Sequence, residues 1–430
     1  MATGANPKMI HGNNRKQTEF VKVAVLFDNF GPYHLARLRA AAQVCELLAV
    51  EVAAASAEYA WEPRDQRMAD GTEWQIVTLL EQGTSRKASA KQLRQRLSRA
   101  LEDFRPQAVF IPGWSSPAAF IALAWCLQSR VPAVAMSEST AWDERRVGWK
   151  EQIKKKFLKL CSAALAGGQA HREYLGQLGL PPERVFLGYD AVDNDYFAAQ
   201  SAARSQRSAS SQPHDLPAKY FLASNRFIAK KNLFRLIEAY ARYRQLAENR
   251  NPPADIWDLV LLGDGEQRKD LENHIARLGL GRWVRLPGFQ QYPDLPAYYG
   301  CAQVFIHAST TEQWGLVVNE AMASGLPVLV SNRCGCARDL VAEGRNGFTF
   351  DPSNLEELAR LMLKVSADLF PLSDFGAESR RIIGRWGPDQ FARGLKSAAE
   401  AALAVGPQSG SWQQKLFLAA LVWQASRTHR

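Results

Sequence analysis

Short apolar runs alternate with helix-like segments from one end of the chain to the other. In the first half, the runs at residues 21–27, 108–112, 132–136 and 163–168 are typical of buried strands, and each precedes apolar positions at helical spacing. Strands that are apolar throughout and separated by helices indicate a parallel sheet covered on both faces. The pattern therefore predicts an α/β domain over residues 21–197, with a disordered tail at 1–20.

The alternation stops at residues 198–217, which are rich in Ser, Ala, Gln and Arg and show no apolar period. We expect a linker or exposed loop there. A second α/β domain is predicted at 218–385, with strands at 220–224, 258–263, 283–286, 303–309 and 327–331. Helices at 386–430 are expected to cross back to the first domain. Two doubly wound domains imply a cleft, with ligands at the carboxyl ends of the strands.

Composition narrows the class of protein without choosing a function. A chain of 430 residues suits two domains, and 47% apolar with 22% charged residues is typical of a globular protein. The net charge of +10 favours an anionic partner such as a nucleotide, a lipid headgroup or a nucleic acid. We see no signal peptide, no spanning apolar run and no zinc-ligand spacing among the six cysteines. We therefore expect a cytoplasmic protein with reduced thiols.

Two cations precede a helix-like segment in the second half. Arg226 and Lys231 stand five positions apart in SNRFIAKKN, just after the predicted strand at 220–224. Cations are badly placed at the positive end of a helix dipole unless an anion lies there too. A phosphate would meet both side chains and the helix N-terminus. The alternative is a solvated basic loop.

Two carboxylates flank an apolar segment further along. Glu312 precedes Gly315 in a loop, and Glu320 lies on the helix predicted to begin near Gly315. Carboxylates can accept hydrogen bonds from the vicinal hydroxyls of a ribose or hexose. The backbone of Gly315, Leu316 and Val317 can meet phosphate or sugar oxygens. Both glutamates can equally be ordinary surface charges.

Two glycine turns follow neighbouring strands. The sequence LLGDGEQR places Gly263 in a tight turn, but Arg268 stands where the third glycine of a dinucleotide fingerprint belongs. A plain strand-to-helix turn is the other interpretation. RLPGF ends a strand at Gly288 and Phe289, which suits a backbone passing close to a nucleobase.

Together these segments resemble the retaining glycosyltransferases of family 4, which have the GT-B fold. The resemblance rests on E-QWGLVVN-E, NRFIAKKN, LLGDGE and RLPGF, in the same order and spacing, over about residues 220–350. It implies an α/β fold of two Rossmann-like, doubly wound domains facing a cleft. It also implies transfer of a sugar from a nucleotide-diphosphate sugar to a glycan, lipid-linked or small-molecule acceptor, in surface polysaccharide or glycoconjugate synthesis.

The resemblance implies a role for each motif residue. Arg226 and Lys231 would bind the donor diphosphate, Glu320 the ribose hydroxyls and Glu312 the transferred sugar. The implied donor site also includes Gly31, Gly263, Gly288, Phe289, Trp314, Gly315, Leu316 and Val317. Glu312, Arg226 and Lys231 are the implied catalytic groups, acting without a metal or other cofactor.

The first half matches the family less closely. DNFGPYHLARL has one glycine, Gly31, where the family has a pair. Where many members carry an acceptor-side histidine, this chain has Ser137, Glu138 and Ser139. Glu138, Ser137 and His34 are the acceptor-side candidates, although His34 also suits a local role at a helix start. YDAVDNDYF replaces the usual Asn-Gly-Val-Asp at the end of the first domain.

Three alternatives remain. A metal-dependent glycosyltransferase would use an Asp-x-Asp string, which Asp193-Asn194-Asp195 matches. A dinucleotide-dependent oxidoreductase is disfavoured by the missing third glycine, and a non-catalytic nucleotide-binding protein is a further alternative. A nucleic-acid binder would need aromatic residues interleaved on a basic strand, and the sequence shows none.

Two basic segments raise the question of a membrane. Residues 145–160 hold seven cations against Glu151, with Trp149, Ile153, Phe157 and Leu160 at helical spacing. Residues 85–101 form a second basic helix-like segment. We expect either contact with an anionic membrane surface or apolar faces packed on the sheet with solvated lysines.

Overall fold

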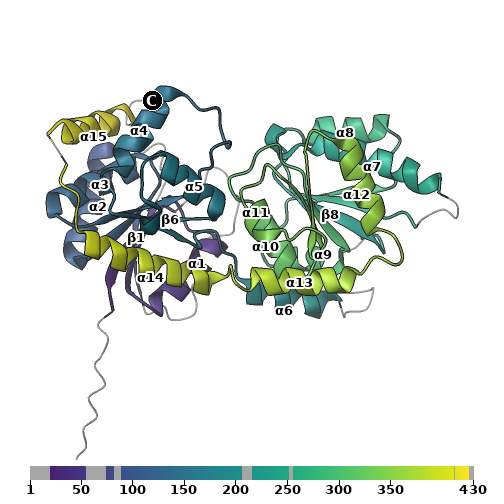
Figure 1. The fold of residues 1–430 in the computed structure, drawn as a ribbon, viewed down its shortest axis with the longest axis horizontal. Coiled ribbons are helices and arrows are strands. Elements are labelled where there is room, and N and C mark those ends of the chain that lie inside the picture. The colour runs from purple at the N-terminus through teal and green to yellow at the C-terminus, as the bar shows by residue number, and fades with distance from the viewer. Residues whose placement is uncertain are drawn as a thin grey trace, which may run out of the picture.

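The computed structural model describes residues 20–54, 74–81, 89–205, 216–250, 255–410 and 412–425. They form two α/β domains side by side, each built on a parallel sheet (Figure 1). This is the predicted fold class. Of the predicted tail at 1–20, residues 1–19 lie outside the described part of the chain.

The first sheet has the strand order β3-β2-β1-β4-β5-β6-β7, and all its described pairs are parallel. Its strands are β1 (Lys22–Phe27), β2 (Glu46–Ala53), β3 (Gln75–Leu80), β4 (Ala108–Pro112), β5 (Ala133–Ser137), β6 (Ala163–Ala166) and β7 (Val185–Leu187). The apolar runs predicted β1, β4, β5 and β6. They did not predict β2, β3 and β7, because β3 is largely half-exposed, β7 has only three residues and β2 carries two glutamates.

Helices cover both faces of this sheet. One face packs against α1 (Pro32–Ala42) and α14 (Pro388–Val405). The other packs against α2 (Ala90–Phe104), α3 (Pro117–Ser129), α4 (Gly148–Leu158), α5 (Gln169–Gln177) and α15 (Trp412–Ala425). The chain therefore returns to the first domain after completing the second, and α14 can be followed in yellow beneath the sheet in Figure 1.

The second sheet has the order β10-β9-β8-β11-β12-β13, again parallel throughout its described pairs. Its strands are β8 (Tyr220–Ser224), β9 (Asp258–Leu262), β10 (Val284–Gly288), β11 (Val304–His307), β12 (Val328–Ser331) and β13 (Gly347–Phe350). One face packs against α7 (Leu233–Glu248), α8 (Arg268–Arg277) and α12 (Leu355–Val365). The other packs against α9 (Leu295–Cys301), α10 (Leu316–Ala323), α11 (Ala337–Leu340) and α13 (Leu372–Ile383).

The predicted linker at 198–217 begins too early. Helix α6 (Asn194–Ser205) continues into it and packs against α9 and α10 of the second domain. The contact uses small residues: Ser201 Oγ lies 2.9 Å from Ser324 Oγ, and a Cβ on Gly300 would lie 2.4 Å from the carbonyl oxygen of Ser201. A segment that packs through Ser and Gly shows no apolar period, so its burial leaves no signal in the sequence. Residues 206–215 lie outside the described part of the chain.

All six cysteines lie within the described ranges, and each is a free thiol. Among the described residues, no helix combines the length and the apolar character needed to cross a bilayer.

Candidate functional site

Two loops at the carboxyl end of the second sheet bring cations and a carboxylate together. Lys230 and Lys231 end the 3-10 turn Ala229–Lys231 after β8, and Glu312 follows β11, the strand next to β8 in the sheet. Lys230 Nζ lies 3.2 Å from Glu312 Oε1, and Lys231 Nζ contacts Oε2. Parallel strands end at the same edge, which is why residues some 80 positions apart meet there.

The ionised form of Glu312 is held by further polar neighbours. His307 Nε2 lies 3.6 Å from Glu312 Oε2, and the Ser309 hydroxyl donates to the same oxygen at 3.4 Å. Burial raises the pKa of Glu312, but the hydrogen bond with His307 and the charges of Lys231 and Lys230 outweigh burial. The net result is a pKa well below the usual range, so Glu312 is an anion throughout the physiological pH range.

Glu320 lies in α10 and is almost completely buried. The Tyr33 hydroxyl donates to its Oε1 at 2.5 Å, and the Tyr299 hydroxyl donates to Oε2 at 2.6 Å. Tyr33 belongs to α1 of the first domain. In this structure each carboxylate oxygen of Glu320 therefore accepts a hydrogen bond from a tyrosine, one from each domain. Burial raises the pKa of Glu320 to about 7, against the opposing effect of the two hydroxyls.

The predicted glycine turns flank the Lys–Glu cluster. Gly263 has φ +120°, and a Cβ there would lie 1.8 Å from the carbonyl oxygen of Asn225, so no side chain fits. Gly288 also has positive φ and ends β10, and Phe289 after it is 40% exposed. Arg226 follows Asn225 in the loop after β8 and is half-buried. These residues come from three neighbouring strand ends.

The start of α10 is arranged as the sequence predicts, with one correction. Gly315 is the N-cap residue with φ +106°, and Gly315, Leu316 and Val317 are partly exposed. Trp314 is 1% exposed and packs against the ring of Trp386 at 5.3 Å. Its indole N–H donates to Asn319 Oδ1. Trp314 is a core residue, and this corrects its assignment to the donor site.

A cavity of about 340 Å³ lies between the domains beside this cluster. Its lining from the second domain is Lys230, Thr311, Glu312 and Gln313; from the first it is Trp114, Ser115, Ser139, Asp143 and Glu144. The volume is at the small end of the range of ligand pockets. Its walls are mostly polar, as a sugar requires.

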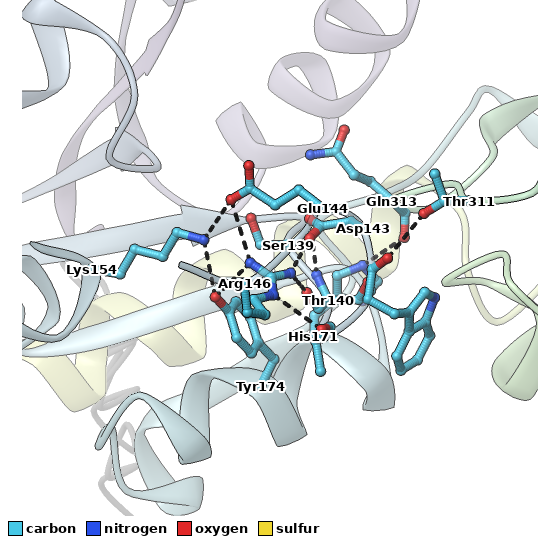
Figure 2. Close-up of polar contacts among 12 residues, drawn as sticks. Ser139, Thr140, Asp143, Glu144, Arg146, Lys154, His171, Tyr174, Thr311 and Gln313 are labelled. Carbon is cyan, nitrogen blue, oxygen red and sulfur yellow. Dashed lines mark hydrogen bonds and ion pairs between the residues drawn. The ribbon is translucent and has the colours of Figure 1, made fainter. Parts of the chain in front are cut away.

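Most of the wall from the first domain is the loop between β5 and α4, and two cations, the partly buried Arg146 and the buried Lys154, hold its shape (Figure 2). Arg146 donates to the carbonyl oxygens of Ala141 and Thr140 and pairs with Asp143. Lys154 lies 2.8 Å from Glu144 Oε1 and 3.0 Å from the Tyr174 hydroxyl. Because these bonds are satisfied without a ligand, the loop is a preformed surface.

This loop also touches the second domain. The Trp142 indole N–H donates to the carbonyl oxygen of Arg333 at 3.1 Å, and the Thr311 hydroxyl donates to the Trp142 carbonyl at 3.3 Å. His171 Nε2 lies 2.9 Å from the carbonyl oxygen of Gln313. The two walls of the cavity are therefore held against each other.

Several predicted first-domain contacts are internal instead. The Gly31 N–H donates to His34 Nδ1 at 3.1 Å, and burial lowers the pKa of His34 to about 3. His34 is thus a neutral residue that caps the start of α1, and the Gly31 N–H is already used. Ser137 is buried and accepts from the backbone N–H of Ser139. Of the three acceptor-side candidates, Glu138 and His34 are partly exposed, and Ser137 is buried.

The Asp-x-Asp string has a local structural role. Asp193 Oδ1 accepts from the backbone N–H of Tyr196 at the start of α6, and the Asn194 amide donates to the carbonyl oxygen of Ile383. The Asp193 bond is a helix N-cap, and the Asn194 bond joins α6 to the end of α13. Across the described ranges, His, Cys, Asp and Glu side chains form no group of three that could hold a metal ion.

The structure adds residues that the sequence did not single out. Lys230 pairs with Glu312 as Lys231 does. Its position directly before Lys231 in AKKN is a feature of the sequence from which this role could have been predicted. Tyr33 and Tyr299 meet Glu320 from distant parts of the chain, which no local pattern shows. The Asn225 amide is 9% exposed, and within the described residues neither of its polar atoms has a hydrogen-bond partner.

Comparison with known proteins agrees with this geometry. Residues 205–381 match the family model described as glycosyl transferases group 1. The chain is 33% identical to the lipopolysaccharide core biosynthesis glycosyltransferase LpsE of Rhizobium meliloti over 36% of this chain and 41% of that protein. It is 28% identical to mannosylfructose-phosphate synthase of Agrobacterium fabrum over 56% and 54% of the two chains. The chain thus spans about half the length of these curated relatives or less.

Solved structures agree on the fold. The crystal structure of Anabaena Alr3699/HepE in complex with UDP and glucose superposes with a TM-score of 0.65, covering 87% of this chain and 98% of that one. The two sequences are 19% identical. Sucrose-phosphate synthase from Thermosynechococcus elongatus superposes with a TM-score of 0.64 at 17% identity, covering 87% of this chain and 97% of that one. The architecture is that of the GT-B glycosyltransferases.

Proposed function

We propose that this protein is a retaining glycosyltransferase, because its second domain matches the glycosyl transferases group 1 family. It transfers a sugar from a nucleotide-diphosphate sugar to a hydroxyl of a glycan, lipid-linked or small-molecule acceptor. The observation that carries the proposal is the cluster of Lys230, Lys231 and Glu312, of which Lys230 and Glu312 line an interdomain cavity. The name of the LpsE relative and the UDP and glucose in the HepE complex support a nucleotide-sugar donor and a role in surface glycan synthesis.

The donor lies across the carboxyl end of the second sheet in this proposal. Lys231, Arg226 and the start of α10 bind the diphosphate, and Glu312 accepts from hydroxyls of the transferred sugar. Gly288 and Phe289 contact the base. Glu320 accepts from the ribose hydroxyls once Tyr33 releases it.

The chemistry requires stabilisation of the leaving group. Negative charge develops on the diphosphate as its bond to the anomeric carbon breaks, and preorganised cations at that point lower the barrier. The acceptor hydroxyl attacks from the same face and gives its proton to the departing phosphate oxygen, which preserves the anomeric configuration. The protein supplies position and charge, and a metal ion or other cofactor has no required role.

The test is a panel of UDP-, GDP- and ADP-sugars in thermal unfolding. A ligand that binds the folded state raises its stability by about 2.7 kcal/mol at one hundred times its dissociation constant. We expect the nucleotide sugars of one base to raise the unfolding temperature more than those of the other two. Transfer with that donor and NMR of the product's anomeric linkage then test retention. If no nucleotide sugar stabilises the protein, the proposal fails.

We also propose that the first domain touches an anionic membrane surface, through α4 and α15. Trp149, Trp412 and Leu416 are each at least 60% exposed, which is unusual for large apolar side chains. The helices are neighbours, since Lys156 Nζ lies 4.9 Å from the centroid of the Phe417 ring. Exposed tryptophans among exposed lysines suit an interface with acidic lipids.

The structure corrects one part of the sequence argument for this surface. Lys154 is buried and paired with Glu144 and Glu151, so it does not belong to the exposed cationic face. Phe157 and Leu160 are buried against the sheet. The proposed surface therefore leaves out Lys154, Phe157 and Leu160 and is centred on Trp149, Lys150, Lys156, Trp412 and Leu416.

A further inference from the structure

The first-domain wall of the cavity carries a carboxylate oxygen that no described residue uses as a hydrogen-bond acceptor. Glu144 Oε1 accepts from Lys154 at 2.8 Å and from Arg146 at 3.5 Å. The other oxygen, Oε2, stands 4.0 Å from Lys150 Nζ, beyond hydrogen-bond distance. Figure 2 shows the first oxygen joined to Lys154 and Arg146 and the second without a bond. Glu144 is exposed and lines the cavity, so Oε2 can accept from a ligand.

This wall holds more carboxylates than cations. Arg146 and Lys154 lie among Asp143, Glu144 and Glu151, each of which is within 3.5 Å of one of the two cations. Three negative charges against two positive ones leave one negative charge in excess. The exposed Lys150 offsets little of it, because a solvated ion pair at 4.0 Å is weak. The chain as a whole carries +10, so the negative charge of this wall is a local feature.

The opposite wall has the reverse balance. Lys230 and Lys231 both pair with Glu312, so two positive charges meet one negative charge and one positive charge is in excess. The cavity therefore has a positive side in the second domain and a negative side in the first. An anionic group is favoured beside the lysines and disfavoured beside Glu144.

Trp114 adds an apolar surface to the negative side. It follows β4, is partly exposed and lines the cavity. Its ring meets that of Phe157 edge-on at 6.3 Å, and Lys154 Nζ lies 5.9 Å from its centroid. The buried Phe157 thus fixes the ring. The Ser139 hydroxyl, which has no partner among the described residues, lines the same wall. An aromatic ring beside a few polar acceptors suits the apolar C–H groups and the hydroxyls of a sugar.

We propose that the first-domain wall binds the acceptor through an uncharged sugar unit, whose C–H groups pack on Trp114 and whose hydroxyl group donates to Glu144 Oε2, and that this wall excludes a sugar bearing a phosphate there. That the bound sugar is the acceptor rests on the glycosyltransferase function proposed above. Its binding and the selection against negative charge do not.

The first experiment measures binding without using transfer. The whole chain is labelled with 5-fluorotryptophan, and the fluorine resonance of Trp114 is assigned from its absence in Trp114→Phe. Glucose, galactose and mannose are titrated, each against its own 6-phosphate. We expect at least one neutral sugar to shift this resonance to saturation, and its 6-phosphate to bind about tenfold more weakly or worse. No shift with any neutral sugar, or equal binding of the 6-phosphate, overturns the proposal.

The second experiment tests the charge of Glu144. Glu144→Gln keeps the shape of the side chain, and Lys154 keeps Glu151 as a partner at 3.1 Å, so no buried cation is left alone. The preference for the neutral sugar over its 6-phosphate is expected to fall by about tenfold. Glu248→Gln is the matched control, because Glu248 is an exposed glutamate of α7 that pairs with Arg244. An unchanged preference in Glu144→Gln overturns the role of Glu144.

Transfer assays separate this proposal from the proposed function. The same sugars and 6-phosphates are compared as acceptors by kcat/KM, and the neutral members are expected to be preferred by about tenfold or more. If no nucleotide sugar is turned over while the Trp114 resonance still selects neutral sugars, the transferase function fails and the binding site stands. If transfer is measured and the 6-phosphates react as well as their neutral parents, the function stands and the selection against charge is overturned.

Discussion

The phenol oxygen of Tyr33 lies 2.5 Å from Oε1 of Glu320, so the first helix of one domain is bonded to a buried carboxylate of the other. Tyr299 holds the second oxygen from within the same domain as Glu320. Glu320 is also the residue proposed to bind the ribose of the donor. In the proposed donor complex, a ribose hydroxyl takes the place of the Tyr33 hydroxyl on Glu320 Oε1.

We expect Tyr33→Phe to tighten the binding of the nucleoside diphosphate. Removing the hydroxyl frees Oε1 of Glu320, and hydrogen bonds to charged groups contribute about 1.5–3 kcal/mol, or roughly tenfold to hundredfold in Kd. Isothermal titration calorimetry measures the change. Tyr299→Phe, on the other oxygen, is the matched control that leaves the interdomain bond in place. Weaker binding by Tyr33→Phe would instead show that Tyr33 contacts the donor.

Lys231→Ala is expected to reduce transfer by about 10² to 10³ while leaving the fold intact. Removing a charge that stabilises the transition state costs about 3 kcal/mol or more. Glu312 keeps Lys230 as a partner, so no buried charge is left alone. Lys219→Ala is the control, because Lys219 is exposed and pairs with Asp255. Near-normal turnover by Lys231→Ala would mean that the donor site is misplaced.

Glu320→Gln is expected to stabilise the protein at neutral and higher pH. The folded pKa of Glu320, about 7, is above its unfolded value of 4.5, so the folded state binds the extra proton between these limits. Stability from this group is therefore present below pH 4.5 and lost as pH rises to 7, by up to about 3 kcal/mol. Urea unfolding at pH 4.5 and pH 8 should show a difference between variant and wild type only at pH 8. An equal difference at both pH values would contradict the pKa.

Transfer is expected to continue after exhaustive EDTA treatment, because protein cations face the diphosphate. Asp193→Ala should lower stability by about 1 kcal/mol through loss of a helix cap, without changing transfer. Activity that disappears with EDTA, returns with Mn²⁺ and is lost in Asp193→Ala would favour the metal-dependent alternative.

Vesicle co-sedimentation tests the membrane surface. The double variant Lys150→Glu, Lys156→Glu is expected to lose binding to phosphatidylglycerol vesicles at low salt, since each lysine near an anionic leaflet contributes about 1 kcal/mol. Wild-type binding should weaken as salt rises. Lys219→Glu, on the second domain, is the control. Binding that persists in the double variant would leave an acceptor in solution as the better proposal.

The order of residues along the chain was enough to predict the architecture and the glycine turns at the carboxyl ends of its strands. Fully apolar strands between helices can only be satisfied in a covered parallel sheet, so the class follows from the pattern. Glycines with positive φ, such as Gly263 and Gly315, can also be predicted from the sequence, because a tight turn after a strand favours glycine. Arg226, Lys231 and Glu312 lie beside such turns, at strand ends that a parallel sheet brings to one edge.

Which polar groups meet could be learned only from the folded molecule. Tyr33 and Glu320 are 287 positions apart, and Lys231 and Glu312 are 81 positions apart. Trp314 is a residue type suited to a ligand contact, and Lys154 is suited to a membrane contact. Both are buried in the folded molecule. Burial, protonation and pairing depend on everything that surrounds a side chain in three dimensions, whereas periodicity depends only on neighbours along the chain.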